Sequence, residues 1–464
     1  MSSSDLKTML EPESAVVFGV SLSNENSIGS TVFRNLKRMG TEVYAVNPKP
    51  TDRENFYRDI EDLPRIPDLA IVSLPANKVL GVMEKVIDKG VRSAIIQSSG
   101  FREGGKEGAE MERELASIIE NSDIRVLGPN TMGILDNISG LDTFFVSEDI
   151  IKRPRQGMVT FISQSGYLAL PFLETLNEMH VGLRAFVGLG NKVDIDENEL
   201  LEYFGRQGDS VLAFYIETFT DGRRFYGLSK KVTPHSPIVL LKGGRSERGS
   251  KAVQSHTGNI AKTSGKLLDG MMKQAGIIKA EDERELVEFS TALSCYKPLT
   301  RGNIAEVSSA GSMGIIVSDL IEKSGSDLSI ADLSQDTIEK LETVVSPLGS
   351  VTNPIDLTPE VDNRTLLRTI EILDGDPNLD AVLLCLSKAI NLDDPSISDI
   401  TAIYPSLSKP LVITLHGGAN ADKWRKGFHE IGIPIFDSTG RAVKVLEILR
   451  ERGKYLEKVK ERGG

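Results

Sequence analysis

The sequence is poor in the residues that build covalent or metal frameworks. Its 464 residues include two cysteines, Cys295 and Cys385, and neither belongs to a Cys-x-x-Cys pair. A disulfide scaffold and a cysteine-based zinc site are therefore excluded. Lysine and arginine total 54 against 66 acidic residues, for a formal net charge of −12. Because nucleic acids attract clustered cations, no nucleic-acid partner is expected.

Long apolar runs are also missing. No run approaches the ~20 residues that a membrane span requires. The first residues, Met-Ser-Ser-Ser-Asp-Leu, lack the basic and apolar regions of a signal peptide. We therefore expect a soluble, cytoplasmic chain with no membrane partner.

Glycine, in contrast, is abundant at 42 residues, and short apolar runs alternate with helical patterns. This alternation predicts doubly wound parallel α/β sheets, in which ligands bind beyond the carboxyl ends of the strands. We predict three such domains, Rossmann-like or flavodoxin-like, at residues 1–140, 145–297 and 300–464. A polar stretch with proline and glycine at 297–302 is the predicted linker before the third domain.

Small polar residues follow the predicted strands of the first domain, at 15–20, 42–47, 68–74, 93–97 and 125–128. The first turn, 19–29, is not Gly-x-Gly-x-x-Gly. The second strand leads into Asn47-Pro48-Lys49, where a nicotinamide site would have an acidic residue. An NAD-linked dehydrogenase is thus disfavoured. Lysine and the N–H groups of helix starts suit a phosphate-bearing, nucleotide-like ligand.

Two further strand ends lie in the second domain. The strand at 157–163 runs into Ser-Gln-Ser-Gly at 163–166 and a helix expected from Tyr167. This pattern is typical of an anion site, although Ser165 could equally be a plain helix cap. Acidic residues at 194, 196 and 197 predict a second helix start, with metal binding as the alternative.

The strand at 211–217 ends in Glu217, and the strand at 237–241 leads into a predicted glycine- and cation-rich loop, 242–258, which contains His256. Sequential strands are usually neighbours, so Glu217 and His256 are expected to lie close together. A carboxylate that accepts a hydrogen bond from one imidazole nitrogen leaves the other as a nucleophile. A structural glutamate paired with Arg223 or Arg224 is the alternative.

The third domain offers no catalytic group from its residues alone. A glycine turn at 309–314 precedes an apolar helix. The segment 351–357 is predicted to be a loop between helices. His416 and His429 are interpreted as structural.

The ordered motifs resemble the succinyl-CoA synthetase superfamily. Gly19-x-Ser21, Asn47-Pro48, Ser73-x-Pro75 and Gly-Pro-Asn-x-x-Gly at 128–133 resemble its CoA-binding domain. Ser-x-Ser-Gly, then Ile216-Glu217, then His256-x-Gly258 resemble its phosphohistidine domain. The third domain is then its ligase domain, where the glycine turn would supply a helix dipole.

The resemblance assigns roles to individual residues. It implies contacts to CoA from Gly19, Ser21, Lys49, Ser73, Pro75, Asn77 and Ser98. It implies that His256 is phosphorylated and that Glu217 orients it. Phosphate would be held by Ser163, Gln164, Ser165, Gly166, Thr257 and Gly258.

The sequence Gln-Ser-His-Thr-Gly at 254–258 is most similar to the ADP-forming acyl-CoA (acetyl-CoA) synthetases. The implied reaction is acyl-CoA + ADP + phosphate ⇌ acid + CoA + ATP, with the phosphohistidine on a mobile loop. The chain has neither a Walker loop nor an ATP-grasp pattern. Mg-ADP or Mg-ATP is therefore expected mainly on a separate β chain, in an α2β2 complex. A succinyl-CoA-type ligase for another acid and a CoA-binding regulatory protein are the alternatives; the acyl group stays open.

Overall fold

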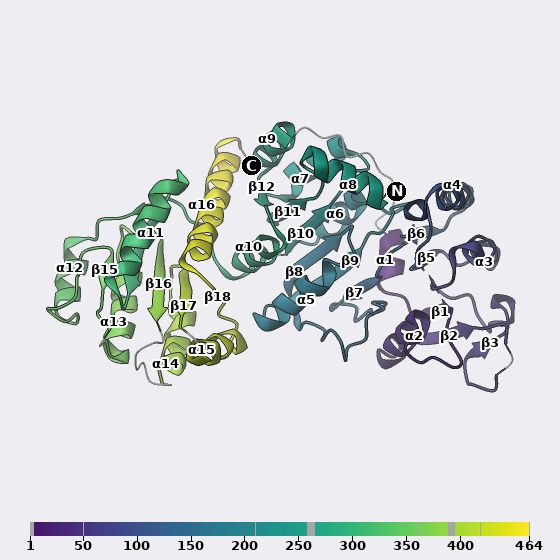
Figure 1. The fold of residues 1–464 in the computed structure, drawn as a ribbon, viewed down its shortest axis with the longest axis horizontal. Coiled ribbons are helices and arrows are strands. Elements are labelled where there is room, and N and C mark those ends of the chain that lie inside the picture. The colour runs from purple at the N-terminus through teal and green to yellow at the C-terminus, as the bar shows by residue number, and fades with distance from the viewer. Residues whose placement is uncertain are drawn as a thin grey trace. The chain divides into compact units, whose positions relative to one another are not determined.

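The computed structural model describes residues 4–49, 51–208, 210–257, 265–359, 361–387, 395–417 and 419–463. These residues form three mostly parallel sheets with helices between the strands (Figure 1), which confirms the predicted fold class. The chain divides into two compact units. Unit 1 comprises Met1–Glu174 and Gly182–Leu286 and holds two sheets, whereas unit 2 comprises Thr175–Val181 and Val287–Gly464 and holds the third. The predicted domain boundaries stay predictions.

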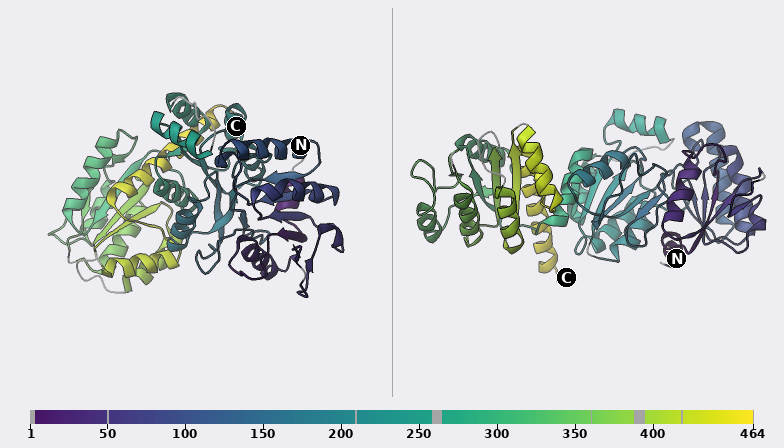
Figure 2. Two further views of the ribbon diagram at one scale, coloured as in Figure 1. Left: turned by 45° about the vertical axis from the view of Figure 1, so that its right-hand side comes forward. Right: turned by 90° about the horizontal axis from the view of Figure 1, so that it is seen from below.

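The first sheet of unit 1 has the strand order β3-β2-β1-β4-β5-β6, and all its pairs are parallel. Its strands are β1 (Ser14–Phe18), β2 (Glu42–Val46), β3 (Phe56–Tyr57), β4 (Leu69–Val72), β5 (Ser93–Ile96) and β6 (Arg125–Leu127). Its helices are α1 (Ser4–Leu10), α2 (Ile28–Arg38), α3 (Ala76–Asp88) and α4 (Lys106–Glu120). Helices cover both faces of this sheet (Figure 2), so the central strands β1, β4 and β5 are buried throughout and, apart from Ser14 and Ser93, apolar.

The second sheet of unit 1 has the order β12-β11-β10-β8-β9-β7. Its strands are β7 (Ile134–Asp136), β8 (Gln156–Ser163), β9 (Leu183–Gly188), β10 (Val211–Ile216), β11 (Ile238–Lys242) and β12 (Ile277–Ala280). The helices that follow these strands are α5 (Ala169–Glu178), α6 (Glu197–Gly205), α7 (Gly222–Val232), α8 (Glu247–Thr257), α9 (Gly265–Ala275) and α10 (Glu283–Cys295). Of these, α5 passes into unit 2 after Glu174 and α10 after Leu286. The edge strand β7 is antiparallel to β9 and was not predicted. Its three residues are too short a run for sequence periodicity to reveal.

The sheet of unit 2 has the order β14-β13-β16-β17-β18, and β15 also pairs with β13. Its strands are β13 (Asn303–Ser308), β14 (Ser329–Ile330), β15 (Ile355–Asp356), β16 (Ala381–Ser387), β17 (Leu411–His416) and β18 (Ile435–Phe436). Its helices are α11 (Gly311–Ser324), α12 (Gln335–Glu342), α13 (Asn363–Asp374), α14 (Pro395–Ile403), α15 (Ala419–Glu430) and α16 (Thr439–Glu461). The predicted loop at 351–357 is wrong at its end, because Ile355 and Asp356 pair with Val307 and Ser308.

The predicted loop at 242–258 is also wrong over most of its length, because Glu247–Thr257 is the helix α8. The Ser246 hydroxyl caps the helix start by accepting a hydrogen bond from the Gly249 N–H at 3.0 Å. Lys251 pairs with Glu247 one turn away, and Val253 is buried. This local cap and packing outweigh the low helix propensity of serine and glycine.

The structure describes the backbone of His256 and Thr257 but not their side chains, and Gly258 lies outside the described residues. Across the described part of the chain, no helix has both the length and the apolar character needed to cross a bilayer.

Candidate active site

The predicted CoA-binding residues all lie at one edge of the first sheet, where β1, β2, β4 and β5 end. Several of their hydroxyl groups brace this edge. The Ser73 hydroxyl donates to Gln97 Oε1 at 2.7 Å, and Ser98 Oγ accepts from the Leu74 N–H at 3.0 Å. Ser21 Oγ accepts from the Asn24 N–H at 2.9 Å. These three serines therefore shape the turns, and their contact with CoA stays a prediction.

Gly19 has a backbone role at this edge. Its φ is 98°, and a Cβ atom placed on it would lie 2.1 Å from the Ser73 carbonyl oxygen. Only glycine combines this conformation with such a close approach. The first turn can therefore pack directly against the end of β4.

The same edge also presents groups that suit an anion. Helix α3 begins after Pro75 without a side-chain cap, so no capping side chain accepts from the N–H groups of its first turn, which includes Asn77. The Lys78 N–H donates to the Pro75 carbonyl oxygen at 2.9 Å. Pro75, Asn77 and Lys49 are exposed. The helix start supplies a dipole, and Lys49 supplies an exposed cation, for a phosphate-bearing ligand.

The predicted phosphate site at the end of β8 is a turn rather than a helix start, because α5 begins at Ala169. The Ser163 hydroxyl donates to the Ser165 carbonyl oxygen at 2.7 Å. Gly166 packs against Met132, and a Cβ atom on the glycine would lie 2.8 Å from Met132 Cγ. Ser165 and Gly166 are partly exposed. The sequence therefore places the helix too early, and the phosphate assignment stays a prediction.

Glu217 follows β10 directly, and β10 lies between β8 and β11. Ile216 pairs with Lys242, the last residue of β11, so the strand that leads to α8 ends beside Glu217. This confirms that the two strands are neighbours. The Glu217 side chain is 5% exposed. Its Oε1 accepts a hydrogen bond from the Tyr215 hydroxyl at 3.1 Å. Burial and the adjacent carboxylate raise the pKa of Tyr215, which keeps this hydroxyl a proton donor.

The alternative pairing of Glu217 with Arg224 is not the arrangement found. Arg224 instead approaches Glu202 at 3.3 Å. The backbone N–H groups of Arg223 and Arg224 donate to Asp221, which caps helix α7.

Two buried lysines at this strand end were not predicted as part of the site. Lys242 Nζ donates to the carbonyl oxygen of Glu217 at 2.6 Å. Burial, with Lys192 and Arg245 nearby, lowers the pKa of Lys242 to about 8, against the opposing effect of Glu217. Lys192 Nζ donates to the carbonyl oxygen of Thr218 at 2.5 Å. Lysine in a glycine-rich stretch is typical of solvated loops. The sequence therefore offers little indication that Lys242 and Lys192 bind the main chain at the end of β10.

The acids at the start of α6 act as a cap and as ion-pair partners. Asp196 accepts from the N–H groups of Asn198 and Glu199, which confirms the predicted helix start. Asp194 pairs with Arg125 at 2.9 Å. Glu197, which is fully buried, pairs with Lys192 at 2.7 Å.

In unit 2, the predicted glycine turn at 309–314 is wrong over most of its length, because residues 311–314 form the first turn of α11. The helix starts at Gly311 after Ala310, which gives no side-chain cap. His429 is buried and accepts from the Ile435 N–H at 3.3 Å, and burial lowers its pKa to about 4. It is therefore a neutral core histidine, as interpreted from the sequence.

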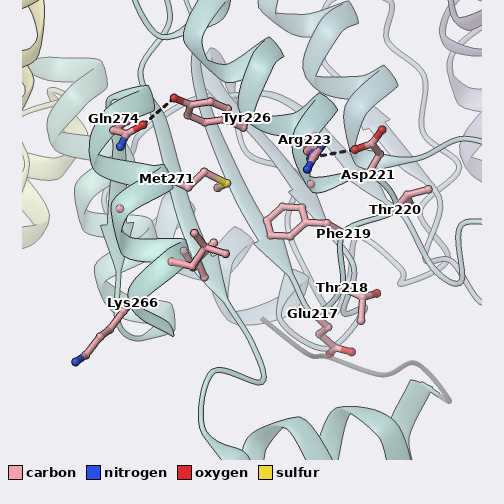
Figure 3. Close-up of a pocket in the computed structure, with 14 residues that line it drawn as sticks. Glu217, Thr218, Phe219, Thr220, Asp221, Arg223, Tyr226, Lys266, Met271 and Gln274 are labelled. Carbon is pink, nitrogen blue, oxygen red and sulfur yellow. Dashed lines mark hydrogen bonds between the residues drawn. The ribbon is translucent and has the colours of Figure 1, made fainter. Parts of the chain in front are cut away.

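A pocket of about 960 Å³ opens between the segment after β10 and helix α9 (Figure 3). Phe219 and Met271 form its apolar wall, whereas Glu217 and Thr218 lie at its far end. Tyr226 and Gln274 close the opposite end with a hydrogen bond of 2.9 Å. The Glu217 carboxylate accepts a hydrogen bond from Tyr215, which is not among the residues that line the pocket.

Comparison with protein families divides the chain into three matching segments. Residues 13–137 match the CoA binding domain, residues 156–293 the succinyl-CoA ligase like flavodoxin domain, and residues 304–454 the Ligase-CoA domain. The three matches agree with the three parallel sheets and with the buried Glu217 at the carboxyl end of β10. Together they place the chain in the class of CoA ligases.

Individual relatives narrow the family. The chain is 32% identical to Acetate–CoA ligase [ADP-forming] I subunit alpha of Pyrococcus furiosus, covering 98% of this chain and 100% of the relative. It is also 32% identical to the enzyme II subunit alpha of that organism, covering 93% and 94%. A longer relative from Archaeoglobus fulgidus, Acetate–CoA ligase [ADP-forming] I, is 32% identical over 98% of this chain, which spans 65% of that protein.

The fold agrees with these sequences. The structure of Ca. Korarchaeum cryptofilum dinucleotide forming Acetyl-coenzyme A synthetase 1, in complex with phosphate and ADP, matches with a TM-score of 0.89 and 28% identity over 99% of each chain. The chain belongs to the family of ADP-forming acetate–CoA ligases and corresponds in extent to their alpha subunits.

Proposed function

We propose that this chain is the alpha subunit of an ADP-forming acyl-CoA synthetase that works with a separate ATP-grasp β chain. One observation carries the proposal: β8, β10 and β11 are parallel neighbours, so Ser163–Gly166, Glu217 and the strand leading to the His256 helix end at one sheet edge. This is the edge at which such sheets bind ligands.

The proposed reaction has three balanced steps. Phosphate attacks the thioester carbonyl of acyl-CoA, the C–S bond breaks, and CoA and an acyl phosphate form. A His256 nitrogen then attacks the phosphorus, the P–O bond to the acyl group breaks, and the acid leaves. Finally the phosphoryl group passes from His256 to Mg-ADP on the β chain, which forms ATP and regenerates the histidine. In these steps Glu217 orients His256. The identity of the acyl group stays open, and the α2β2 stoichiometry and the cytoplasmic location stay predictions.

Phosphohistidine chemistry tests the proposal directly. The chain is incubated with its β chain and γ-labelled ATP, and the label is examined for acid lability and base stability. Label is expected on the wild type and absent from His256→Ala. His235→Ala is the matched control, because His235 is an exposed histidine of the same domain. Equal labelling of wild type and His256→Ala would refute the proposal.

A further inference from the structure

Lys192 has an unusual environment that the proposed steps do not use. It lies in the turn between β9 and α6 with a φ of 61°, a conformation that strains a residue with a Cβ atom. Its side chain is 4% exposed and pairs with Glu197, which is 0% exposed, at 2.7 Å. Strained backbone conformations cost free energy and cluster at functional sites. Burying the ion pair adds the cost of removing both charges from water.

The lysine completes a set of bonds that holds the end of β10. Gln164 Oε1 accepts from the N–H groups of Glu217 and Thr218, at 2.9 and 3.1 Å. Lys242 Nζ donates to the Glu217 carbonyl oxygen at 2.6 Å, and Lys192 Nζ to that of Thr218 at 2.5 Å. All four main-chain polar groups of these two residues are therefore bound by side chains from three other segments. Such bonding leaves the Glu217 carboxylate little freedom of position.

The residue before Lys192 joins this strand end to the first domain. Asn191 Nδ2 donates to Glu103 Oε2 and Glu112 Oε2, each at 2.7 Å. Glu103 Oε1 in turn accepts from the N–H groups of Gly100 and Phe101, at 2.6 and 3.1 Å. Gly100 and Phe101 follow Ser98 at the predicted CoA-binding edge. Asn191 thus binds the side of the predicted CoA-binding edge, and Lys192 binds the end of β10.

We propose that Lys192 is a positioning residue that sets Glu217 at a defined place relative to the CoA-binding edge, with Asn191 as its link to that edge. The inference rests on the proposed function. Lys192 does not touch the reacting atoms. It acts through the carbonyl group of Thr218, and thereby through the main chain that carries Glu217.

The proposal separates two half-reactions. Transfer from ATP to His256 requires Glu217 alone, so Lys192→Met should slow it. Transfer from acyl-CoA and phosphate to His256 also requires that the end of β10 keep its position relative to the predicted CoA-binding edge. Asn191→Ala should therefore slow only this second reaction. Both rates are measured on the complex with the β chain, together with calorimetric CoA binding and the melting temperature.

Stability is controlled by a second variant, because Lys192→Met leaves Glu197 buried without its cation. The double variant Lys192→Met/Glu197→Gln removes that charge and keeps the side-chain volumes. We expect its ATP-driven labelling rate to fall about tenfold or more, with CoA affinity within twofold of the wild type. Lys192→Arg, which keeps a cationic donor, should recover part of the rate.

A folded double variant that labels at the wild-type rate would overturn the inference and leave the proposed function intact. The inference would also be overturned if Lys192→Arg lost as much rate as the double variant and CoA affinity fell by the same factor. That result would indicate general damage to the folded protein. Absence of label on wild-type His256 would instead refute the proposed function itself.

Discussion

At the scale of single residues, the site is defined by buried ionisable groups whose partners the sequence does not reveal. Glu217 was predicted because it ends an apolar strand. Its contacts with Tyr215, and the hold of Gln164 and Lys242 on its main chain, depend on strand order and could not be predicted. Gln164 was predicted to bind phosphate, yet its amide oxygen accepts hydrogen bonds from the N–H groups of Glu217 and Thr218.

Glu217→Gln tests the orienting role of the carboxylate. Glutamine keeps the size of the side chain but removes the charge that would stabilise a phosphorylated or protonated imidazole. We expect ATP-driven labelling of His256 to slow about tenfold or more, which equals about 1.4 kcal/mol of lost transition-state stabilisation. CoA affinity, measured by calorimetry, should not change. Glu202→Gln, on α6 of the same domain, is the control, and unchanged turnover in Glu217→Gln would remove the role.

Glu306 of β13 gives unit 2 a predicted pH dependence. It is fully buried, and neither carboxylate oxygen has a hydrogen-bond partner of good geometry among the described residues. Burial raises its pKa from 4.5 to about 7, although Cys385 and Ser308 nearby oppose the shift. The folded protein therefore binds this proton more tightly than the unfolded chain does. Stability is lost as the pH rises from about 4.5 to 7, by roughly 3 kcal/mol in total.

Glu306→Gln should abolish that loss, because the amide does not ionise. Between pH 5 and pH 8 the wild type should lose roughly 3 kcal/mol of unfolding free energy that the variant does not lose. Calorimetric unfolding of the whole chain at the two pH values measures the difference. Glu322→Gln, an exposed position on α11, serves as the control. A pH dependence identical to that of the wild type would mean that Glu306 is ionised in the folded protein at neutral pH.

At the scale of elements, apolar runs predicted the central strands well because both faces of each sheet are covered. The runs at 42–47, 68–74 and 93–97 contain β2, β4 and β5, and the run at 15–20 contains β1 except its first residue, Ser14. The elements that were missed are those whose formation depends on neighbours. Strand β7 forms by pairing with β9 and by a bridge between Leu135 and Asp142, and α8 is supported by a cap and by the buried Val253.

The helix that carries His256 should weaken when its cap is removed. In Ser246→Ala the Gly249 N–H loses its acceptor, which destabilises a helix by about 1 kcal/mol. We expect faster hydrogen exchange across residues 247–253, with exchange in β11 unchanged. Glu247→Gln is a matched control, because its exposed pair with Lys251 contributes only about 0.5 kcal/mol. Equal exchange in Ser246→Ala and wild type would show that packing of α8 alone maintains the helix.

At the scale of the whole molecule, the order of the three matched segments decides which steps this chain can perform unaided. It contains a CoA binding domain and both ligase-type domains, whereas its sequence has no Walker loop or ATP-grasp pattern. We therefore expect labelled phosphate, supplied with acyl-CoA, to reach His256 on this chain alone.

γ-Labelled ATP should label the chain only after the β chain is added, because the proposed function places the nucleotide on that partner. His256→Ala should take no label in either direction. Labelling by ATP without the β chain would place a nucleotide site on this chain and contradict the division of labour. Failure of acyl-CoA and phosphate to label the isolated chain would instead mean that the partner also completes the phosphate site, whose described part is the turn at Ser163–Gly166 rather than a helix start.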